Sequence, residues 1–384
     1  MTSQPFNEFI VKVASRCNLN CDYCYEFNLG DESWKQQPKR MTESTARALG
    51  RRIAEHAAKH AIEQVFVSLH GGEVLLLGSD RLAAICEALR AEITPRTGLQ
   101  LTMQTNAVLM SSAYIDVIKR FNIGVSISID GDAAAHDRHR KDHHGRGSHA
   151  QVVQGIKLLL EASPEHLIGF LSVIDVRTDP VQILDSVAAF GVESVDFLLP
   201  HHNWDNRPPR PDGDPVAYGK WYWALYQAWT ADRHPDVRIR VLTNIVSQLV
   251  GGASVFEDMT LAPATLVTIA TDGSIEGVDS LKSTATGLQR LGLNIHEHDF
   301  DSALNHPLVQ LRQSGAAQLC ATCLACEFKR ECAGGYFPHR WRSHSDFDNP
   351  SVYCSDLYWL VSQIKADLLE RRRRRAALRN RSAG

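Results

Sequence analysis

Residues 15–25 read Ser-Arg-Cys-Asn-Leu-Asn-Cys-Asp-Tyr-Cys-Tyr and contain three cysteines. Three residues separate Cys17 from Cys21, and two separate Cys21 from Cys24. The preceding residues 8–14 alternate in polarity and favour a strand. A loop leaving that strand could wrap three thiolates around a cubane iron–sulfur cluster, which usually takes four cysteines. The fourth iron would then stay open for an exchangeable ligand, just as catalytic zinc sites keep an open position.

The other cysteines show that this loop is one of two groups. Five more lie near the end of the chain: Cys320, Cys323, Cys326, Cys332 and Cys354. In a reducing compartment, clustered cysteines indicate metal or redox chemistry rather than disulfides. Zinc is the alternative for the first group, although it would normally use two-residue gaps and a fourth protein ligand. Cys86 lies in a helical apolar pattern, and we interpret it as a core residue.

Strand-like and helix-like segments alternate along the first two hundred residues. The expected strands are residues 8–14, 65–70, 100–105, 123–129, 167–174 and 195–199. The expected helices are residues 42–57, 80–93, 112–121, 148–161 and 180–190. This α/β pattern predicts a parallel sheet with helices outside it. Six units are too few for a closed eight-stranded barrel, so we expect a partial (β/α)6 barrel that binds ligands at the carboxyl ends of its strands.

The alternation of strand-like and helix-like segments ends after residue 200, and three domains are expected. Residues 1–200 would form the barrel, residues 201–260 a helical bridging region, and residues 261–384 a domain that holds the second cysteine group. A proline-rich loop opens the bridging region, followed by helices at residues 217–230 and 237–250. Residues 267–278 resemble a β-hairpin with a tight turn at Asp272-Gly273. A final helix runs from Asp356 into the arginines at 371–375.

Composition limits the classes of partner. The 384 residues carry a formal net charge of −3, which gives no general attraction to nucleic acid or to an anionic membrane. No stretch approaches the roughly 18 apolar residues of a membrane span. The N-terminus lacks a basic segment followed by an apolar run, so no secretory signal is expected. These features favour a cytoplasmic location.

The segment at residues 15–25 resembles the signature of radical S-adenosylmethionine (SAM) enzymes. The resemblance implies that SAM chelates the open iron and is cleaved to a 5′-deoxyadenosyl radical, which abstracts a hydrogen from substrate. Motifs after later strands, such as His70-Gly-Gly-Glu73, also resemble that family, although Val74 replaces its usual proline. The implied SAM-binding residues are Tyr23, Gly71, Gly72, Glu73, Gln104, Asn106, Ser126, Ser128, Asp130 and Arg140.

The second cysteine group resembles the SPASM extension of radical SAM peptide maturases. The resemblance implies a SPASM/twitch-like iron–sulfur domain whose one auxiliary 4Fe–4S cluster is bound by Cys323, Cys326, Cys332 and Cys354. Tyr336 stands where a further SPASM cysteine is expected, and residues 261–282 contain no cysteine, so a second auxiliary cluster lacks its ligands. Cys320 is left over, either as a substitute ligand or as a bystander. A zinc ribbon is the alternative.

Residues 332–341 and 348–356 resemble the maturases that form three-residue cyclophanes in ribosomal peptides. The resemblance implies a precursor peptide as substrate and a small electron donor such as ferredoxin or flavodoxin. Its reaction would abstract a β-hydrogen and join the β-carbon to an aromatic ring. The candidate bases are Asp279 and His339, with His201 and His202 as further candidates. The alternatives are a thioether-forming maturase, a peptide epimerase, a sulfatase-maturing dehydrogenase, and a non-enzymatic iron–sulfur or zinc scaffold.

Three further features have two interpretations each. The five histidines at residues 136–149 indicate a solvated loop, with a separate metal site as the alternative. The aromatic helix around Trp221, Tyr222 and Trp223 is expected to pack the domains together, with peptide binding as the alternative. The arginines at 371–375 are either a solvated helix end or a site for an acidic leader peptide.

Overall fold

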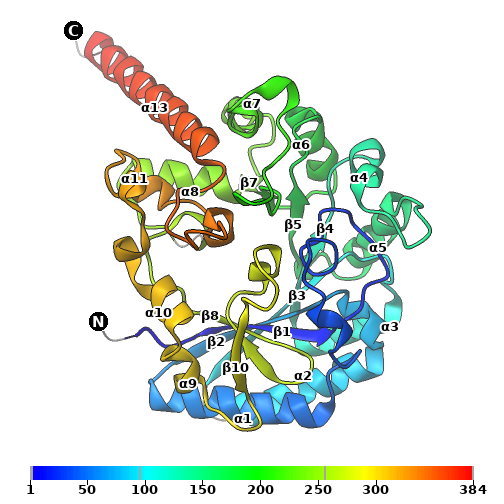
Figure 1. Ribbon diagram of the computed structural model, residues 1–384. Helices are drawn as coiled ribbons and strands as arrows, with labels where there is room; N and C mark the ends of the chain where they lie inside the picture. The colour runs from blue at the N-terminus through cyan, green and yellow to red at the C-terminus, as the bar shows by residue number, and fades with distance from the viewer. Residues whose placement is uncertain (1–2, 95–96, 255–256, 383–384) are drawn as a thin grey trace.

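One ten-stranded sheet organises the protein, as seen in a computed structural model that describes residues 3–94, 97–254 and 257–382 (Figure 1). Its strands lie in the order β10-β9-β8-β1-β2-β3-β4-β5-β6-β7. The first six are β1 (Glu8–Ala14), β2 (Gln64–Gly71), β3 (Gly98–Thr105), β4 (Ile123–Ser128), β5 (Leu167–Val173) and β6 (Ser194–Leu198). Each pairs with the next in parallel, which confirms the expected open barrel.

Helices cover the outside of this curved sheet (Figure 1). They are α1 (Glu43–Lys59), α2 (Ser79–Ile93), α3 (Ser112–Phe121), α4 (Ala133–His139), α5 (His149–Ala162) and α6 (Pro180–Ala188). Thr42 caps α1 by accepting a hydrogen bond from the Thr45 amide, a role in which threonine is common. Valines of adjacent strands, such as Val11, Val67 and Val125, are fully buried between sheet and helices. The parallel sheet therefore forms the core, and its carboxyl ends share one rim.

The later strands extend the barrel sheet at both edges. On one side, β7 (Arg238–Ile239) pairs with β6, so α8 (Arg240–Leu249) begins later than expected. On the other side, β8 (Leu266–Ile269) pairs in parallel with β1 and in antiparallel with β9 (Ser274–Glu276), which pairs with β10 (Arg290–Asn294). The predicted hairpin is confirmed, and it continues the barrel sheet. The domain boundaries at 200 and 260 stay a prediction.

Short helices and two longer ones complete the fold. The α-helices are α7 (Ala217–Thr230), α9 (Phe300–Leu304), α10 (Pro307–Gln313), α11 (Ala321–Leu324), α12 (Lys329–Cys332) and α13 (Cys354–Ser382). The 3₁₀ helices are η1 (Ser33–Lys35), η2 (Val74–Leu77), η3 (Pro164–His166), η4 (Pro211–Gly213), η5 (Glu257–Met259), η6 (Asp279–Ser283), η7 (Gly315–Gln318) and η8 (Phe337–Arg340). Trp221 and Tyr222 of α7 are buried, and Asp356 of α13 accepts hydrogen bonds from the α7 amides of Tyr218 and Gly219. The packing interpretation of the aromatic helix is confirmed.

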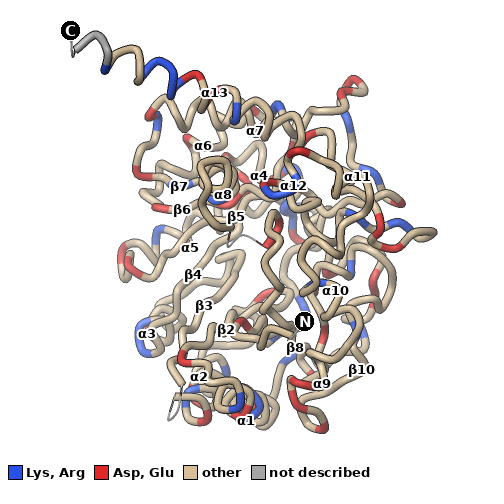
Figure 2. Tube along the Cα trace, turned by 90° about the vertical axis from the view of Figure 1, so that its left-hand side faces the viewer, with Lys and Arg blue, Asp and Glu red and all other residues tan. Residues whose placement is uncertain are grey.

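The surface carries its basic run at one extremity. The second half of α13 projects from the body and bears a concentration of basic residues (Figure 2).

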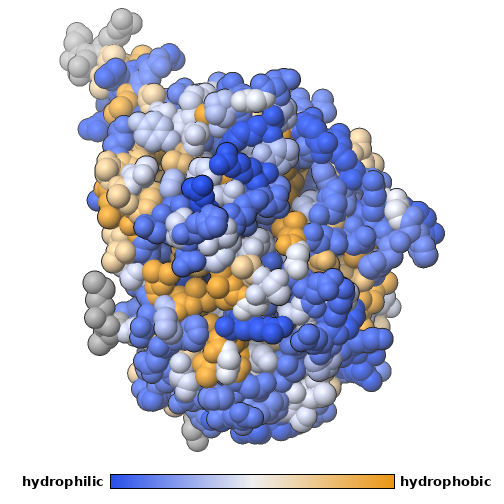
Figure 3. Space-filling model, viewed as in Figure 1, coloured by the Kyte–Doolittle hydropathy of each residue, from blue (hydrophilic) through white to orange (hydrophobic). Residues whose placement is uncertain are grey.

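Most of the face seen in Figure 1 is hydrophilic, with apolar residues gathered near its centre between α10 and β10 (Figure 3). Across the described residues, we find no helix with both the length and the apolar character that a membrane crossing requires.

Candidate functional site

A cavity of about 300 Å³ opens at the carboxyl ends of the barrel strands. Cys17, Cys21 and Cys24, on the loop after β1, all line it. Burial raises the pKa of all three thiols, to about 12 for Cys24. Protons must therefore be displaced when these thiols bind iron. Because no other cysteine lines this cavity within the described ranges, the donor set fits a cluster held by three protein ligands.

The Gly71-Gly72 pair holds the cysteine loop against the end of β2. The Gly72 amide donates a hydrogen bond to the Ala14 carbonyl over 2.8 Å. A Cβ atom on Gly72 would lie 2.5 Å from the carbonyl carbon of Arg16 and 2.6 Å from Cζ of Phe27. The family resemblance implied that Gly71 and Gly72 bind SAM. In the structure, the close approach is made by the loop that carries the three cysteines.

Glu73 joins the ends of β2 and β3. One carboxylate oxygen accepts hydrogen bonds from the Thr105 hydroxyl at 2.5 Å and the Leu75 amide at 3.0 Å. The other oxygen accepts from the Asn106 amide at 2.8 Å. Burial raises the pKa of Glu73, and these three hydrogen bonds act against that rise. Glu73 and Asn106 are therefore fixed in place on the cavity wall, close to Cys17.

Tyr23, Asp130 and Arg140 form a connected polar group beside the thiols. The Tyr23 hydroxyl donates to the Asp130 carboxylate and accepts from Arg140 Nη1 over 2.7 Å. Arg140 lines the cavity, and its buried Nε has no hydrogen-bond partner among the described residues. An unpaired buried guanidinium nitrogen is costly unless a ligand supplies an acceptor, so this position fits a carboxylate group.

The predicted SAM-binding residues divide into two sets. Eight line the cavity: Tyr23, Gly71, Gly72, Glu73, Gln104, Asn106, Ser128 and Arg140. Ser126 and Asp130 do not. Asp130 lies behind this wall, where its second oxygen accepts from the Val173 amide at 3.0 Å. The structure therefore brings together most of the set, with Asp130 positioned to orient Tyr23.

The opposite wall comes from the C-terminal half of the chain. Asp279, Ser280 and Tyr336 line the same cavity. The Asp279 carboxylate accepts from the Tyr25 hydroxyl at 2.7 Å and forms an ion pair with Lys12. Burial, the largest single influence, would raise the pKa of Asp279, but Lys12, His70 and the Tyr25 hydrogen bond together hold that pKa well below its ordinary value. Asp279 is therefore ionised.

His339, the other predicted base, does not line the cavity. Its ring lies 5.3 Å from that of Tyr336 and 6.0 Å from that of His201, and both of these residues line it. Both ring nitrogens are buried without a hydrogen-bond partner among the described residues, and burial lowers its pKa well below the ordinary value. His339 is neutral and is separated from the cavity by two aromatic rings.

Lys12 is a site residue that the sequence analysis missed. It lies on β1, is 4% exposed, and pairs with both Glu26 and Asp279. Glu26 also binds Lys282 at 2.6 Å, so the network crosses from the barrel to η6. The available signal was a lysine at an otherwise apolar position of a strand, since such a residue is rarely buried unless it is paired.

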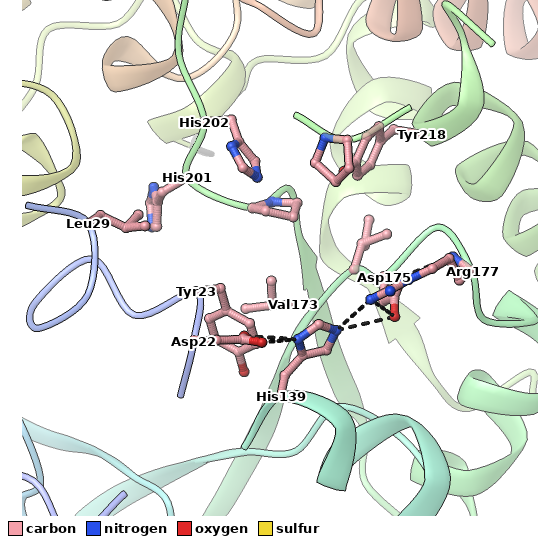
Figure 4. Close-up of a pocket in the computed structure, with 13 residues that line it drawn as sticks. Asp22, Tyr23, Leu29, His139, Val173, Asp175, Arg177, His201, His202 and Tyr218 are labelled. Atoms are coloured by element: carbon pink, nitrogen blue, oxygen red, sulfur yellow. Dashed lines mark hydrogen bonds and ion pairs between the residues drawn. The ribbon is translucent and has the colours of Figure 1, made fainter. Parts of the chain in front are cut away.

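A second cavity of about 220 Å³ adjoins the first and shares Tyr23, Val173 and His201 with it (Figure 4). His139 joins two carboxylates on its wall, with Nδ1 2.9 Å from Asp22 and Nε2 3.2 Å from Asp175. The hydrogen bond with Asp175, followed by that with Asp22, raises the pKa of His139. This side chain therefore ties the cysteine loop to the end of β5.

The expectation of a solvated histidine loop at 136–149 is wrong for His136. This residue is fully buried. One of its ring nitrogens accepts a hydrogen bond from the Asp130 amide, and the other lies 3.0 Å from the Ser148 hydroxyl. Both nitrogens thus have protein partners. His136 supports the turn that carries Asp130 and is not free to bind a metal.

The second cysteine group converges on one place near the start of α13. Cys320 and Cys323 are buried, while Cys326, Cys332 and Cys354 are half-buried. Burial, and then a hydrogen bond from Cys320, raises the pKa of Cys323 to about 12. Burial, then Cys354, raises that of Cys332 to about 12. Cys320 therefore belongs to the same cluster of thiols, which makes five candidate ligands.

Comparisons with known proteins agree with this geometry. Residues 11–184 match the Radical SAM superfamily. The serine-type anaerobic sulfatase-maturating enzyme of Bacteroides thetaiotaomicron is 30% identical over 157 residues, 41% of this chain and 37% of that protein. The cysteine-type enzyme of Clostridium novyi is 22% identical over 368 residues, covering 90% and 91% of the two chains. At 30% identity or more, the chain thus matches these relatives over less than two fifths of their own length.

Solved structures show the same fold. Native anSMEcpe with bound AdoMet superposes with a TM-score of 0.81 and 18% identity, covering 94% of this chain and 98% of that chain. Streptococcus suis SuiB bound to precursor peptide SuiA gives a TM-score of 0.62 and 16% identity, with 92% and 76% coverage. These structures share the fold of this chain, an open parallel barrel followed by a C-terminal region, and the barrel contains the residues, 11–184, that match the Radical SAM superfamily.

Proposed function

We propose that this chain, whose residues 11–184 form a radical SAM domain, is an enzyme that modifies a ribosomally made precursor peptide. The observation that carries the proposal is the shared cavity. It brings three thiols, an unpaired buried Arg140 nitrogen and the C-terminal residues Asp279 and Tyr336 together in one space. A peptide bound between the two halves would meet all of these groups, and the neighbouring cavity offers further room beside Tyr23.

The residues present fit the cofactors that the family uses. Cys17, Cys21 and Cys24 would hold one 4Fe–4S cluster, and the second cysteine group would hold the auxiliary 4Fe–4S cluster. Arg140 would bind the SAM carboxylate, and Glu73 would face the SAM ammonium. When bound, SAM and the first cluster supply a radical that removes a hydrogen atom from substrate. A small electron-carrier protein such as ferredoxin or flavodoxin would provide the reducing electron in the cytoplasm.

The finer proposal is a bond between a peptide β-carbon and an aromatic ring carbon. One hydrogen atom leaves the β-carbon, and the ring then loses one proton and one electron, so each crosslink removes two hydrogens. The second cysteine group would hold an auxiliary cluster that could take up this electron, and a one-electron carrier would then remove it. The chain's own contribution is to hold the two reacting residues close together and to exclude water.

Asp279 is the better supported of the two proposed bases. It faces the cavity as a carboxylate, whereas His339 lies beyond Tyr336 and His201. The adjacent Lys12 ammonium keeps Asp279 ionised, which leaves it able to accept a proton but makes it a weak base. His201 is the competing acceptor, because it lines both cavities and its buried Nδ1 has no partner in the described chain.

Dehydrogenation of a single residue is the second candidate function. It is favoured by the near full-length match to anaerobic sulfatase-maturating enzymes and by the TM-score of 0.81 to anSMEcpe. Both functions remove two hydrogens. They differ in that dehydrogenation leaves a new double bond within one residue, whereas a crosslink connects two residues.

Peptide mass spectrometry separates the two functions. The reconstituted enzyme would be given SAM, dithionite and the peptide encoded beside its gene, with a serine- or cysteine-containing sulfatase peptide in parallel. We expect a loss of about 2 Da in the precursor, no backbone fragmentation between the joined residues, and transfer of deuterium from the β-carbon to deoxyadenosine. A product that reacts with a carbonyl reagent, or label arriving from the α-carbon, would contradict the crosslink.

A further inference from the structure

Arg340 is a buried cation without a carboxylate partner. It ends η8, is 3% exposed, and forms no ion pair with any acidic side chain in residues 3–94, 97–254 and 257–382. Its guanidinium donates instead to neutral oxygens. Nη2 reaches the carbonyls of Ala333 and Gly335 at 2.6 and 3.0 Å, and Nε reaches that of Gly334 at 3.2 Å. Nη1 donates to the Gln318 amide oxygen at 3.3 Å.

These carbonyls belong to the turn that directly follows Cys332. Ala333, Gly334 and Gly335 have φ values of 51°, 78° and 70°, so three successive residues adopt the left-handed region. A Cβ atom on Gly334 would lie 2.9 Å from Cζ of Arg340. The guanidinium is thus packed onto the ligand loop itself. Burial lowers the pKa of Arg340, and negative charge on Cys323, Cys332 and Cys320 acts against that fall and favours the cation.

A buried charge needs compensation from nearby charge of opposite sign. The thiols supply it once they are deprotonated and bound to iron, since a 4Fe–4S cluster with four thiolates is an anion. One-electron reduction makes that anion more negative. A fixed cation in a poorly solvated position therefore stabilises the reduced form more than the oxidised form.

We propose that Arg340 is an internal countercharge that raises the reduction potential of the auxiliary cluster and so equips it to accept the substrate electron. The inference rests on the proposed function, because it requires iron at the second cysteine group. It makes Arg340 a positioning and tuning residue, which touches neither peptide nor SAM.

Two variants separate charge from structure. Arg340→Lys keeps the charge but loses the forked hydrogen bonds to the turn. Gln318→Glu keeps every contact of Arg340 and places a carboxylate against it, at a half-exposed position that tolerates the change. Exposed Arg330, two residues before Cys332, is the matched control as Arg330→Gln, since water screens its charge.

The readout is the midpoint potential of the auxiliary cluster, measured by anaerobic redox titration with electron paramagnetic resonance. Cys17, Cys21 and Cys24 are replaced by alanine in every protein, so that only this cluster contributes. We expect Gln318→Glu to lower the ratio of reduced to oxidised cluster at least tenfold at a fixed potential, which is about 59 mV for one electron. Arg340→Lys and Arg330→Gln should shift it by much less.

An unchanged potential in Gln318→Glu, with four irons retained, would overturn the countercharge role. A fall in Arg340→Lys alone would do the same, because it would mark a purely structural clamp. Failure of the proposed function is a distinct result: the parent protein, with the three N-terminal cysteines replaced, would then hold no iron at the second group.

Discussion

The two cysteine groups show how surroundings determine what a cluster of thiols can do. The N-terminal group offers three thiols on one loop, and these face a cavity together with Glu73, Asn106 and Arg140. The C-terminal group offers five thiols from short helices and turns, and a buried arginine covers the loop after Cys332. The first arrangement leaves coordination and space for a ligand. The second supplies enough thiols to complete a cluster, which suits electron transfer.

The largest expected effect comes from removing one cysteine group and measuring the iron content of the chain. Replacing Cys17, Cys21 and Cys24 by alanine should reduce the iron content from about eight to about four per chain, because each group holds its own cubane. Replacing Cys323, Cys326, Cys332 and Cys354 should also leave about four. Iron and zinc would be measured by plasma mass spectrometry after anaerobic reconstitution.

Two results would contradict this division. Stoichiometric zinc at the C-terminal group would favour the zinc-ribbon alternative. About twelve irons in the unaltered chain would show a third cluster. If Cys320→Ala lowers iron only when combined with Cys323→Ala, Cys320 is a substitute ligand, as its contact with Cys323 suggests.

Substitution of Arg140 tests whether the cavity beside the N-terminal cysteines binds SAM. Arg140→Gln removes the charged donor that has a free buried Nε, so SAM affinity should fall by about 1.5–3 kcal/mol, or roughly 10- to 150-fold. Equilibrium dialysis with labelled SAM measures this. The matched control is Arg138→Gln in α4, whose exposed side chain pairs with Asp175. Equal affinities in all three proteins would remove Arg140 from the SAM site.

Gly72 tests whether the glycine pair serves the cysteine loop. Gly72→Ala would drive a methyl group against the Arg16 backbone and Phe27, and overpacking of this kind costs about 1–3 kcal/mol. The loop should shift, so both the urea midpoint and the iron content should fall. Gly124→Ala is the control, because its Cβ would come closest to the exposed side chain of Ile168, at 3.1 Å, and would make only an ordinary contact with Thr102, at 3.6 Å. Equal effects of the two variants would exclude a specific role.

The sequence predicted the part of this site that depends on parallel strands. Motifs that follow β1, β2 and β3 must share one rim of a parallel sheet, so the sequence predicts that Cys17, Glu73 and Asn106 lie together. The observed ends of these strands and helices differ from the expected ends by only a few residues. Such differences arise because the end of a strand depends on its neighbours in the sheet rather than on residue propensity.

The C-terminal wall could not be predicted in the same way. Tyr336 and Asp279 reach the cavity because β8 pairs with β1, joining residues 266–269 to residues 8–11 across most of the chain. Nothing in local periodicity encodes such a long-range pairing. The buried status of His136 was missed for a related reason, since its partners Asp130 and Ser148 become neighbours only after α4 has formed.

The smallest expected effect concerns the link between the cysteine loop and β5. Hydrogen bonds with Asp175 and Asp22 raise the pKa of His139, so folding favours its protonated form. Its stabilisation is therefore complete below the unfolded pKa of about 6.5 and is lost as pH rises through the higher folded value. The side chain is partly exposed, so the contribution should be at most about 1 kcal/mol.

His139→Gln should make this part of the pH dependence disappear. Urea unfolding of both proteins at several pH values between 6 and 9 would measure it. The difference in stability should shrink as pH rises. A difference that grows with pH would show that the neutral imidazole, rather than the cation, is the favoured form.

The most direct test of the account is to measure 5′-deoxyadenosine formation in two chains that each hold about four irons. One lacks the three N-terminal thiols, and the other lacks Cys323, Cys326, Cys332 and Cys354. With dithionite and SAM, the account predicts no cleavage in the first chain and retained cleavage in the second, because only the N-terminal site leaves coordination open. Cleavage by the first chain, or its complete absence from a soluble, iron-loaded second chain, would contradict the account.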